Sequence, residues 1–115
     1  MPKFALFFRM DILSEDRQPG PELLKTYMTE WNEWINMLLA ENKLSGGNHL
    51  SKAGQVIHAD GRLTRLPYVA NSESVAGYLI LNTIDFEETL KFAKSCPILK
   101  GEGNSVEIRQ LESED

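Results

Sequence analysis

Residues 75–81 read Val-Ala-Gly-Tyr-Leu-Ile-Leu, and this stretch decides the fold. A short, continuous apolar run predicts a strand in the interior of a sheet rather than at its edge. Gly77 lies inside the run, where a glycine is typical of a strand whose backbone another segment approaches closely. We therefore expect a central strand over residues 75–81, with a neighbouring segment close to Gly77.

C-terminal to this strand, the sequence predicts a helix and a last strand. Asp85 is followed three residues later by Glu88, a variant of the capping box that begins a helix. Pro97 ends the helix, because proline cannot continue it. Residues 106–111 alternate between apolar and polar side chains, as a half-buried strand does, and an acidic tail follows over residues 112–115. The apolar stripe of the helix consists of Phe86, Leu90 and Ala93.

N-terminal to the central strand, the sequence predicts a hairpin. Residues 55–59 and 62–66 flank Asp60-Gly61, a dipeptide favoured in two-residue turns because glycine tolerates the positive φ of a type I′ turn. Residues 69–74 are polar and predict a loop. Residues 50–54 fit neither a strand nor a loop clearly.

A long amphipathic helix is predicted from Pro21 to about Asn42. Proline suits the first helical position, since its missing N–H would be unpaired there in any case. Gly46-Gly47 lies just past the predicted end. Before the helix, Lys3–Met10 predicts a short buried strand, and the polar residues 11–19 form a loop long enough to be mobile or to cover a cleft. Apolar residues recur in the helix at three- and four-residue steps: Leu24, Met28, Trp31, Ile35, Leu38 and Leu39.

These elements predict a single α+β domain over residues 1–115, in the order β-α-ββ-β-α-β. We expect a ferredoxin-like sandwich in which two helices cover one face of an antiparallel sheet. The other face would then have no helix on it, and two such sheets packed together would hide both faces. This arrangement predicts a homodimer.

The composition excludes several classes of function. The chain has 115 residues, 42% of them hydrophobic, and a net charge of -5 without a basic run, so we expect neither nucleic acid nor an anionic membrane as partner. No segment approaches the ~20 apolar residues of a membrane span. The single cysteine, Cys96, rules out an internal disulfide, and zinc-binding spacings are absent. We expect a cytoplasmic protein with no metal site and no cofactor.

A series of short motifs along the chain resembles the YCII-related family, whose members carry an Asp-Gly-Pro-Phe (DGPF) motif. At the matching place this chain has Arg65-Leu66-Pro67-Tyr68, so the proline and an aromatic residue are present but Arg65 stands where the family has its acid. The other matching motifs are Tyr27-x3-Trp31-x2-Trp34, Gly46-Gly47, Leu50, Asp60-Gly61, Glu73, Ala76-Gly77-Tyr78, Ala93, Cys96-Pro97 and Val106-Glu107-Ile108-Arg109.

The resemblance implies a ferredoxin-like fold that dimerises into an α/β barrel, with a cleft between the first helix and the signature loop. The activity of the family is largely undefined, and an enzymatic role is inferred for the branch with a His and Asp pair. This chain has neither residue at the matching places, so a His-Asp mechanism does not carry over.

Four residues are the predicted ligand-binding set. Tyr27 and Trp31 would form an aromatic wall, Arg65 would bind an anion through its guanidinium, and Tyr68 would offer a phenol. Each also has a purely structural interpretation. Aromatic residues at helical spacing are more often core, Arg65 would pair with Glu73 or another acid, and Tyr68 would lock its loop. The first hypothesis is a homodimer that binds a small anionic or aromatic molecule.

Two further hypotheses remain open. The chain is an isomerase- or lyase-type enzyme on a small cyclic compound, with His49 or Glu73 as base and Arg65 holding an oxyanion. This requires the base to point into the same pocket as Arg65. Alternatively, it is a structural or interaction module without a ligand, in which the aromatic residues belong entirely to the core or the interface.

Overall fold

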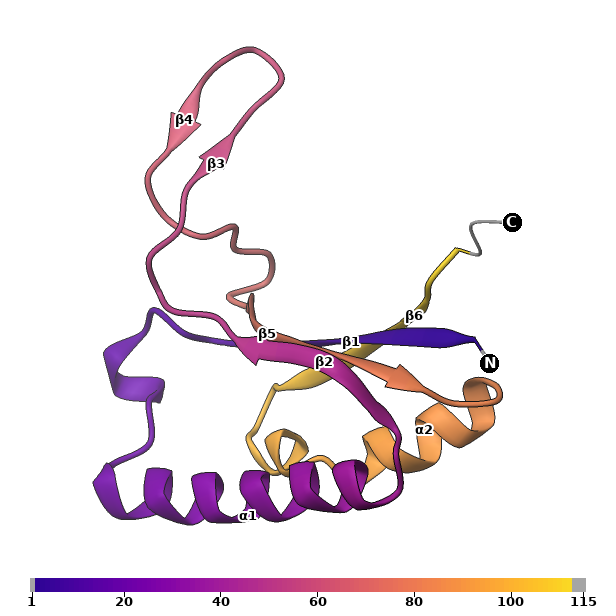
Figure 1. Cartoon of the computed structure of the whole chain (residues 1–115). Coiled ribbons are helices and arrows are strands. Elements are labelled where there is room, and N and C mark those ends of the chain that lie inside the picture. Colours follow the sequence, from indigo (N-terminus) through magenta and orange to yellow (C-terminus); the bar gives the residue numbers. More distant parts are fainter. Residues whose placement is uncertain (1, 113–115) are drawn as a thin grey trace.

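A four-stranded antiparallel sheet forms the body of the molecule, and both helices lie on one of its faces (Figure 1). The computed structural model describes residues 2–112, so residues 113–115 of the predicted acidic tail lie outside it. The strand order β2-β5-β1-β6 is that of a ferredoxin-like domain, which confirms the predicted fold class. The sheet strands are β1 (Lys3–Met10), β2 (Leu44–His49), β5 (Ser74–Asn82) and β6 (Ser105–Gln110). The helices are α1 (Pro21–Ala40) and α2 (Phe86–Lys94), with short 3-10 turns η1 (Glu15–Arg17) and η2 (Pro97–Lys100).

The predicted central strand is confirmed as β5, which lies between β1 and β2. Gly77 faces Phe8 on one neighbour and His49 on the other. A Cβ at this position would lie 3.0 Å from the carbonyl oxygen of Asn48 and 3.4 Å from the Cα of His49. The close approach expected at Gly77 is therefore that of β2.

The predicted helix end at about Asn42 agrees with α1, which ends at Ala40 and is followed by Asn42 with a left-handed φ of 58°. Gly46-Gly47, just past this end, lies within strand β2, which the sequence did not predict. The amide of Asn42 donates to the carbonyl of Leu39, and the amide of Lys43 donates to that of Leu38. This pair of bonds is a Schellman cap, and asparagine can provide its left-handed residue in place of glycine.

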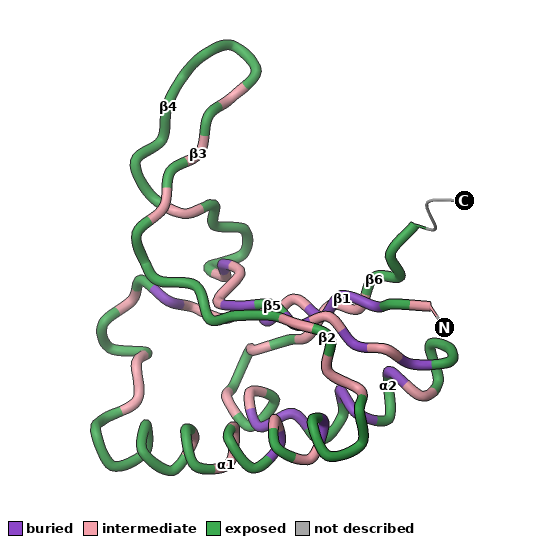
Figure 2. The backbone as a smooth tube through the Cα atoms, viewed as in Figure 1, coloured by how far each residue is buried: buried purple, intermediate pink, exposed green. Residues whose placement is uncertain are grey.

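The predicted hairpin forms, but it is not part of the four-stranded sheet. Its strands β3 (Val56–Ile57) and β4 (Leu63–Thr64) pair only with each other in that part of the chain which the structure describes. Residues 50–73, which we call the arm, project from the sheet on the side away from the helices (Figure 1). The arm is largely exposed (Figure 2), and the side chain of Ile57, in β3, is 77% accessible. The fourth strand of the sheet is therefore β2, with the arm inserted between β2 and β5.

The core lies between the sheet and the two helices. Leu6, Leu38 and Leu81 are fully buried there, from β1, α1 and β5 respectively. Trp34 joins the helices through its indole N–H, which lies 3.2 Å from the carbonyl of Phe92 and 3.1 Å from Ser95 Oγ. Trp34 is thus a core residue.

Cys96 is also buried in this core, and burial raises the pKa of its thiol to about 12. It behaves as the small buried hydrophobe that the sequence predicts.

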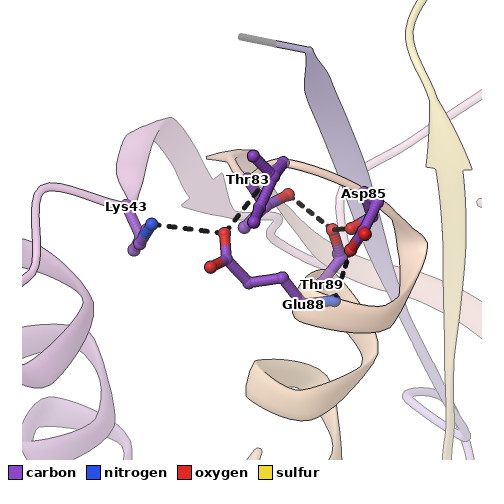
Figure 3. Close-up of polar contacts among 6 residues, drawn as sticks. Lys43, Thr83, Asp85, Glu88 and Thr89 are labelled. Carbon is purple, nitrogen blue, oxygen red and sulfur yellow. Dashed lines mark hydrogen bonds and ion pairs between the residues drawn. The ribbon is translucent and has the colours of Figure 1, made fainter.

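The start of α2 carries the predicted cap (Figure 3). The Asp85 carboxylate accepts from the amide of Glu88 at 2.9 Å, while Glu88 accepts from the amide of Ile84 at 3.1 Å and from Lys43 Nζ at 3.2 Å. Behind the cap, Thr89 donates its hydroxyl to the Asp85 carbonyl and accepts from the hydroxyl of Thr83. Because Lys43 precedes β2, this cluster also ties the start of β2 to α2.

Candidate functional site

A cavity of about 440 Å³ lies between α1 and the helix-covered face of the sheet. Its walls come from α1 and from three strand ends, and its rim comes from two loops. The wall residues are Leu23, Leu24, Tyr27, Met28 and Trp31 on α1, and Phe8, Met10, His49, Ala76 and Gly77 on the sheet. The rim residues are Asp11, Arg17, Gln18 and Pro19 from the first loop, and Pro97, Ile98, Gly101, Glu102 and Asn104 from the second.

Aromatic rings dominate the inner wall. The rings of Phe8 and Trp31 meet edge to face, with centroids 5.2 Å apart. The ring of His49 also contacts Trp31, with centroids 5.0 Å apart and an interplanar angle of 43°. Such contacts between flat rings are favourable beyond the area that they bury. The inner wall is therefore a group of aromatic rings packed against one another.

The spacing along α1 explains which aromatic residues face the cavity. Tyr27 and Trp31 are four residues apart and share one face of the helix, as side chains at i and i+4 do. Both are half-buried, while Trp34 one turn further is buried in the core. The structure thus brings Tyr27 and Trp31 together at the cavity.

The position of His49 follows from the pairing of β2 with β5. His49 lies opposite Gly77, and antiparallel partners place their side chains on the same face of a sheet. That face is the one covered by the helices, so the imidazole points toward α1. None of the hydrogen bonds between side chains in residues 2–112 involves the His49 ring, which leaves both ring nitrogens available to a ligand.

The polar side chains of the rim differ in how far their hydrogen-bonding capacity is used. The Asp11 carboxylate accepts from the amides of Leu13 and Ser14, and the bond from Ser14 is the main reason why the pKa of Asp11 is lowered. Gln18 donates its amide to two carbonyls, at 2.7 and 3.0 Å. The Arg17 guanidinium makes one hydrogen bond within residues 2–112, from Nη2 to the carbonyl of Glu102 at 3.3 Å. The rim cation is therefore the least committed of these groups.

Arg65 and Tyr68, the other two predicted ligand residues, lie on the arm and do not line this cavity. Tyr68 borders a second hollow of about 360 Å³ with Arg9, Pro67 and Val75. Arg65 takes part in none of the ion pairs found between residues 2 and 112. The cleft of this single chain is therefore between α1 and the sheet, not between α1 and the signature loop.

Glu73, the second candidate base, lies at the foot of the arm, outside the cavity. It accepts a hydrogen bond from Ser105 Oγ at 3.3 Å, and its backbone pairs with that of Ala70. Of the two candidate bases, only His49 lines the cavity. Glu107, on β6, pairs with Arg9 of the neighbouring strand β1 at 2.8 Å and with Arg109 of its own strand at 3.6 Å.

Sequence reasoning missed Phe8 and Arg17 as cavity residues. The sequence places Phe8 in a buried strand, and nothing in its alternation with Leu6 indicates that its ring lines a cavity. The length of the loop that carries Arg17 was a signal, because it suggested a segment over a cleft.

No cluster of three or more His, Cys, Asp or Glu side chains in residues 2–112 is placed to hold a metal ion. No helix within the same range has the length and apolarity needed to cross a bilayer.

The fold is similar to that of a characterised enzyme. The chain superposes with a TM-score of 0.51 on 5-chloro-2-hydroxyhydroquinone dehydrochlorinase from Burkholderia phenoliruptrix, whose structure holds 2,5-dihydroxybenzoquinone. The sequence identity is 17%, and the match covers 91% of this chain and 90% of the enzyme. No protein-family model matches the sequence, and no curated protein matches it significantly. The similarity therefore shows a shared fold.

Proposed function

We propose that the chain binds a small, flat ring compound in the cavity between α1 and the sheet. The observation that carries this proposal is the group formed by Phe8, Trp31 and His49, whose rings meet around an open space rather than filling it. The volume of about 440 Å³ lies within the roughly 300–1,000 Å³ typical of small-molecule sites. The quinone bound by the structurally similar dehydrochlorinase is a ligand of this type.

The two tryptophans allow a direct test of binding. In a spectrum of the indole N–H groups, added phenol or catechol should shift the signal of Trp31 more than that of Trp34, which is hydrogen-bonded in the core. Leu24→Ala, in the cavity wall, should weaken binding. Leu39→Ala is the matched control, because it removes an equally exposed leucine (52% against 48%) from the same helix outside the cavity. Equal effects of the two substitutions, or no shift of the Trp31 signal, would refute the proposal.

A second candidate function is proton transfer on the bound ring, with His49 as the base. It is favoured by the place of His49 in the cavity wall, since a general base must lie within hydrogen-bond reach of its substrate. Arg65 does not line this cavity, so the oxyanion-holding role expected of it is not part of this candidate function.

Proton transfer can be tested without knowing the reaction. Cyclic ketones and hydroxylated rings are incubated with the protein in D₂O, and exchange of their acidic C–H groups is followed by NMR. His49→Gln should abolish the exchange while the ring still binds. Exchange at the buffer rate in the presence of the bound compound would refute a catalytic role for His49.

We also propose that two copies associate through the open faces of their sheets, as YCII-related proteins would. Phe7, Tyr78 and Ile80 lie on the face that carries no helix, and Tyr78 is 36% accessible. The exposed arm projects on this same side, so the proposal assigns Arg65 and Tyr68 to contacts with the second copy or its ligand. These two residues would join a site only through that assembly.

Sedimentation of Tyr78→Glu tests the assembly. The substitution should convert a dimer into monomers, because a charge on a covered apolar face is costly. Leu39→Glu places the same charge on α1 and should leave the dimer intact. A wild-type protein that sediments as a monomer at all concentrations would overturn this part of the proposal.

A further inference from the structure

We propose that the ligand of the cavity is an aromatic carboxylate, and that Arg17 is the residue that binds its carboxyl group. This inference rests on the proposed ring-binding function and names the class of compound. It starts from Arg17, which is the one arginine or lysine among the residues that line the cavity.

Arg17 is held at the rim by contacts between two loops that are far apart in the sequence. It ends the 3-10 turn η1, and its Nη2 donates to the carbonyl of Glu102, 85 residues away. Gly103, next to this carbonyl, has a positive φ of 80°, and an added Cβ there would lie 3.6 Å from the same nitrogen. The guanidinium is thus placed over a glycine turn at the cavity edge.

The neighbouring acids do not neutralise Arg17 by direct pairing. None of the ion pairs found in residues 2–112 includes it. Asp11, which shares the rim, accepts from the amides of Leu13 and Ser14, and the nearby charge of Arg17 adds to the lowering of its pKa; Glu102 meets Arg17 through its carbonyl. A guanidinium has five N–H donors in a planar fork, and a single carbonyl uses only one of them.

The chemistry of the two parts of the cavity then specifies the ligand. The inner wall accepts a flat ring, and the guanidinium fork matches a carboxylate, which it can bind through two parallel hydrogen bonds. Lysine would not replace it fully, because an ammonium lacks this planar geometry. The ligand class is therefore a ring with an attached carboxylate.

Benzoate and benzamide test this assignment, because they have the same shape and differ in charge. The wild-type protein should bind benzoate about tenfold more tightly than benzamide, the ratio expected of a charge-assisted hydrogen bond at a partly solvated rim. Arg17→Gln should remove this preference and leave benzamide binding unchanged, and Arg17→Lys should retain only part of it. Arg62→Gln, on the arm outside the cavity, is the matched control.

The outcomes separate this inference from the function on which it rests. If both compounds bind equally well, or if Arg17→Gln and Arg62→Gln have the same effect, the assignment of Arg17 is wrong while ring binding stands. If neither compound shifts the Trp31 signal, ring binding fails and this inference fails with it. Circular dichroism of each variant confirms that the fold is retained, since glutamine can still donate to the Glu102 carbonyl.

Discussion

Replacing Gly47 by alanine tests whether the cavity depends on the pairing of β2 with β5. Gly47 has a φ of +144°, which side chains other than glycine rarely adopt. A Cβ there would lie 2.4 Å from the carbonyl oxygen of Tyr78 and 2.8 Å from the Cα of Leu79. Both atoms belong to the backbone of β5, so no change of rotamer relieves the overlap. The two strands must separate.

The expected cost follows from two contributions. Forcing a residue other than glycine into such a backbone conformation costs about 1–3 kcal/mol. Each hydrogen bond between the strands that lengthens or breaks costs about a further 0.5–1.5 kcal/mol. We therefore expect Gly47→Ala to lower the free energy of unfolding by roughly 3 kcal/mol or more, a large part of the 5–15 kcal/mol typical of a domain. His49 follows two residues later and should move away from Trp31.

Urea denaturation measures this effect, and Gly46→Ala is the control. A Cβ at Gly46 meets nothing within 4 Å, and its φ is not in the positive range. That substitution should change the stability by less than about 1 kcal/mol. Ring binding should also weaken in Gly47→Ala but not in Gly46→Ala. If the two variants unfold within 1 kcal/mol of each other, the packing of β2 on β5 is not as described.

Three further predictions concern the core and the sheet surface. Thr89→Val should lower the free energy of unfolding, measured by urea denaturation, by about 1–3 kcal/mol, because the buried hydroxyl of Thr83 loses its acceptor. Thr83→Val should lower it less, because the Thr89 hydroxyl still donates to the Asp85 carbonyl. A larger effect of Thr83→Val than of Thr89→Val would contradict this hydrogen-bond network. Cys96 should react with a thiol reagent at pH 8 much more slowly in the native protein than in denaturant, because its pKa is raised to about 12, and equal rates would show that it is accessible. The hydrogen bond from Arg9 lowers the pKa of Glu107 below 4.5, so its stabilisation is present above that pH and is lost as the pH falls through the lowered value. The melting temperature of Glu107→Gln should accordingly depend less on pH between 5 and 3 than that of the wild type, and parallel curves would contradict this.

Elements whose signals are local were predictable from the sequence. The helix from Pro21 was visible in the periodicity of its apolar residues, and the start of α2 in the spacing of Asp85 and Glu88. The turn at Asp60-Gly61 was equally local, because a short dipeptide sets its geometry. In each case the residues that specify the structure lie within a few positions of one another.

Strand β2 was not predictable, because its own residues do not favour a strand. Its sequence Leu-Ser-Gly-Gly-Asn-His contains glycine and asparagine, which are depleted in strands. What holds the segment in the sheet is the backbone of β5, some 30 residues further along the chain. The close approach of Gly47 to Leu79 exists only in the folded sheet.

The same distinction explains why half of the predicted site is at the cavity. Tyr27 and Trp31 share a helix face, so their meeting was a local property, and His49 followed once β2 was in place. Arg65 was singled out for its position in a motif, but a hairpin that leaves the sheet carries it away from α1. Arg17 belongs to no motif, but its hydrogen bond to the backbone carbonyl of Glu102 holds it at the rim of the cavity. The loop after β1 therefore places an arginine at the cavity, whereas the tetrapeptide Arg65-Leu66-Pro67-Tyr68 does not line it.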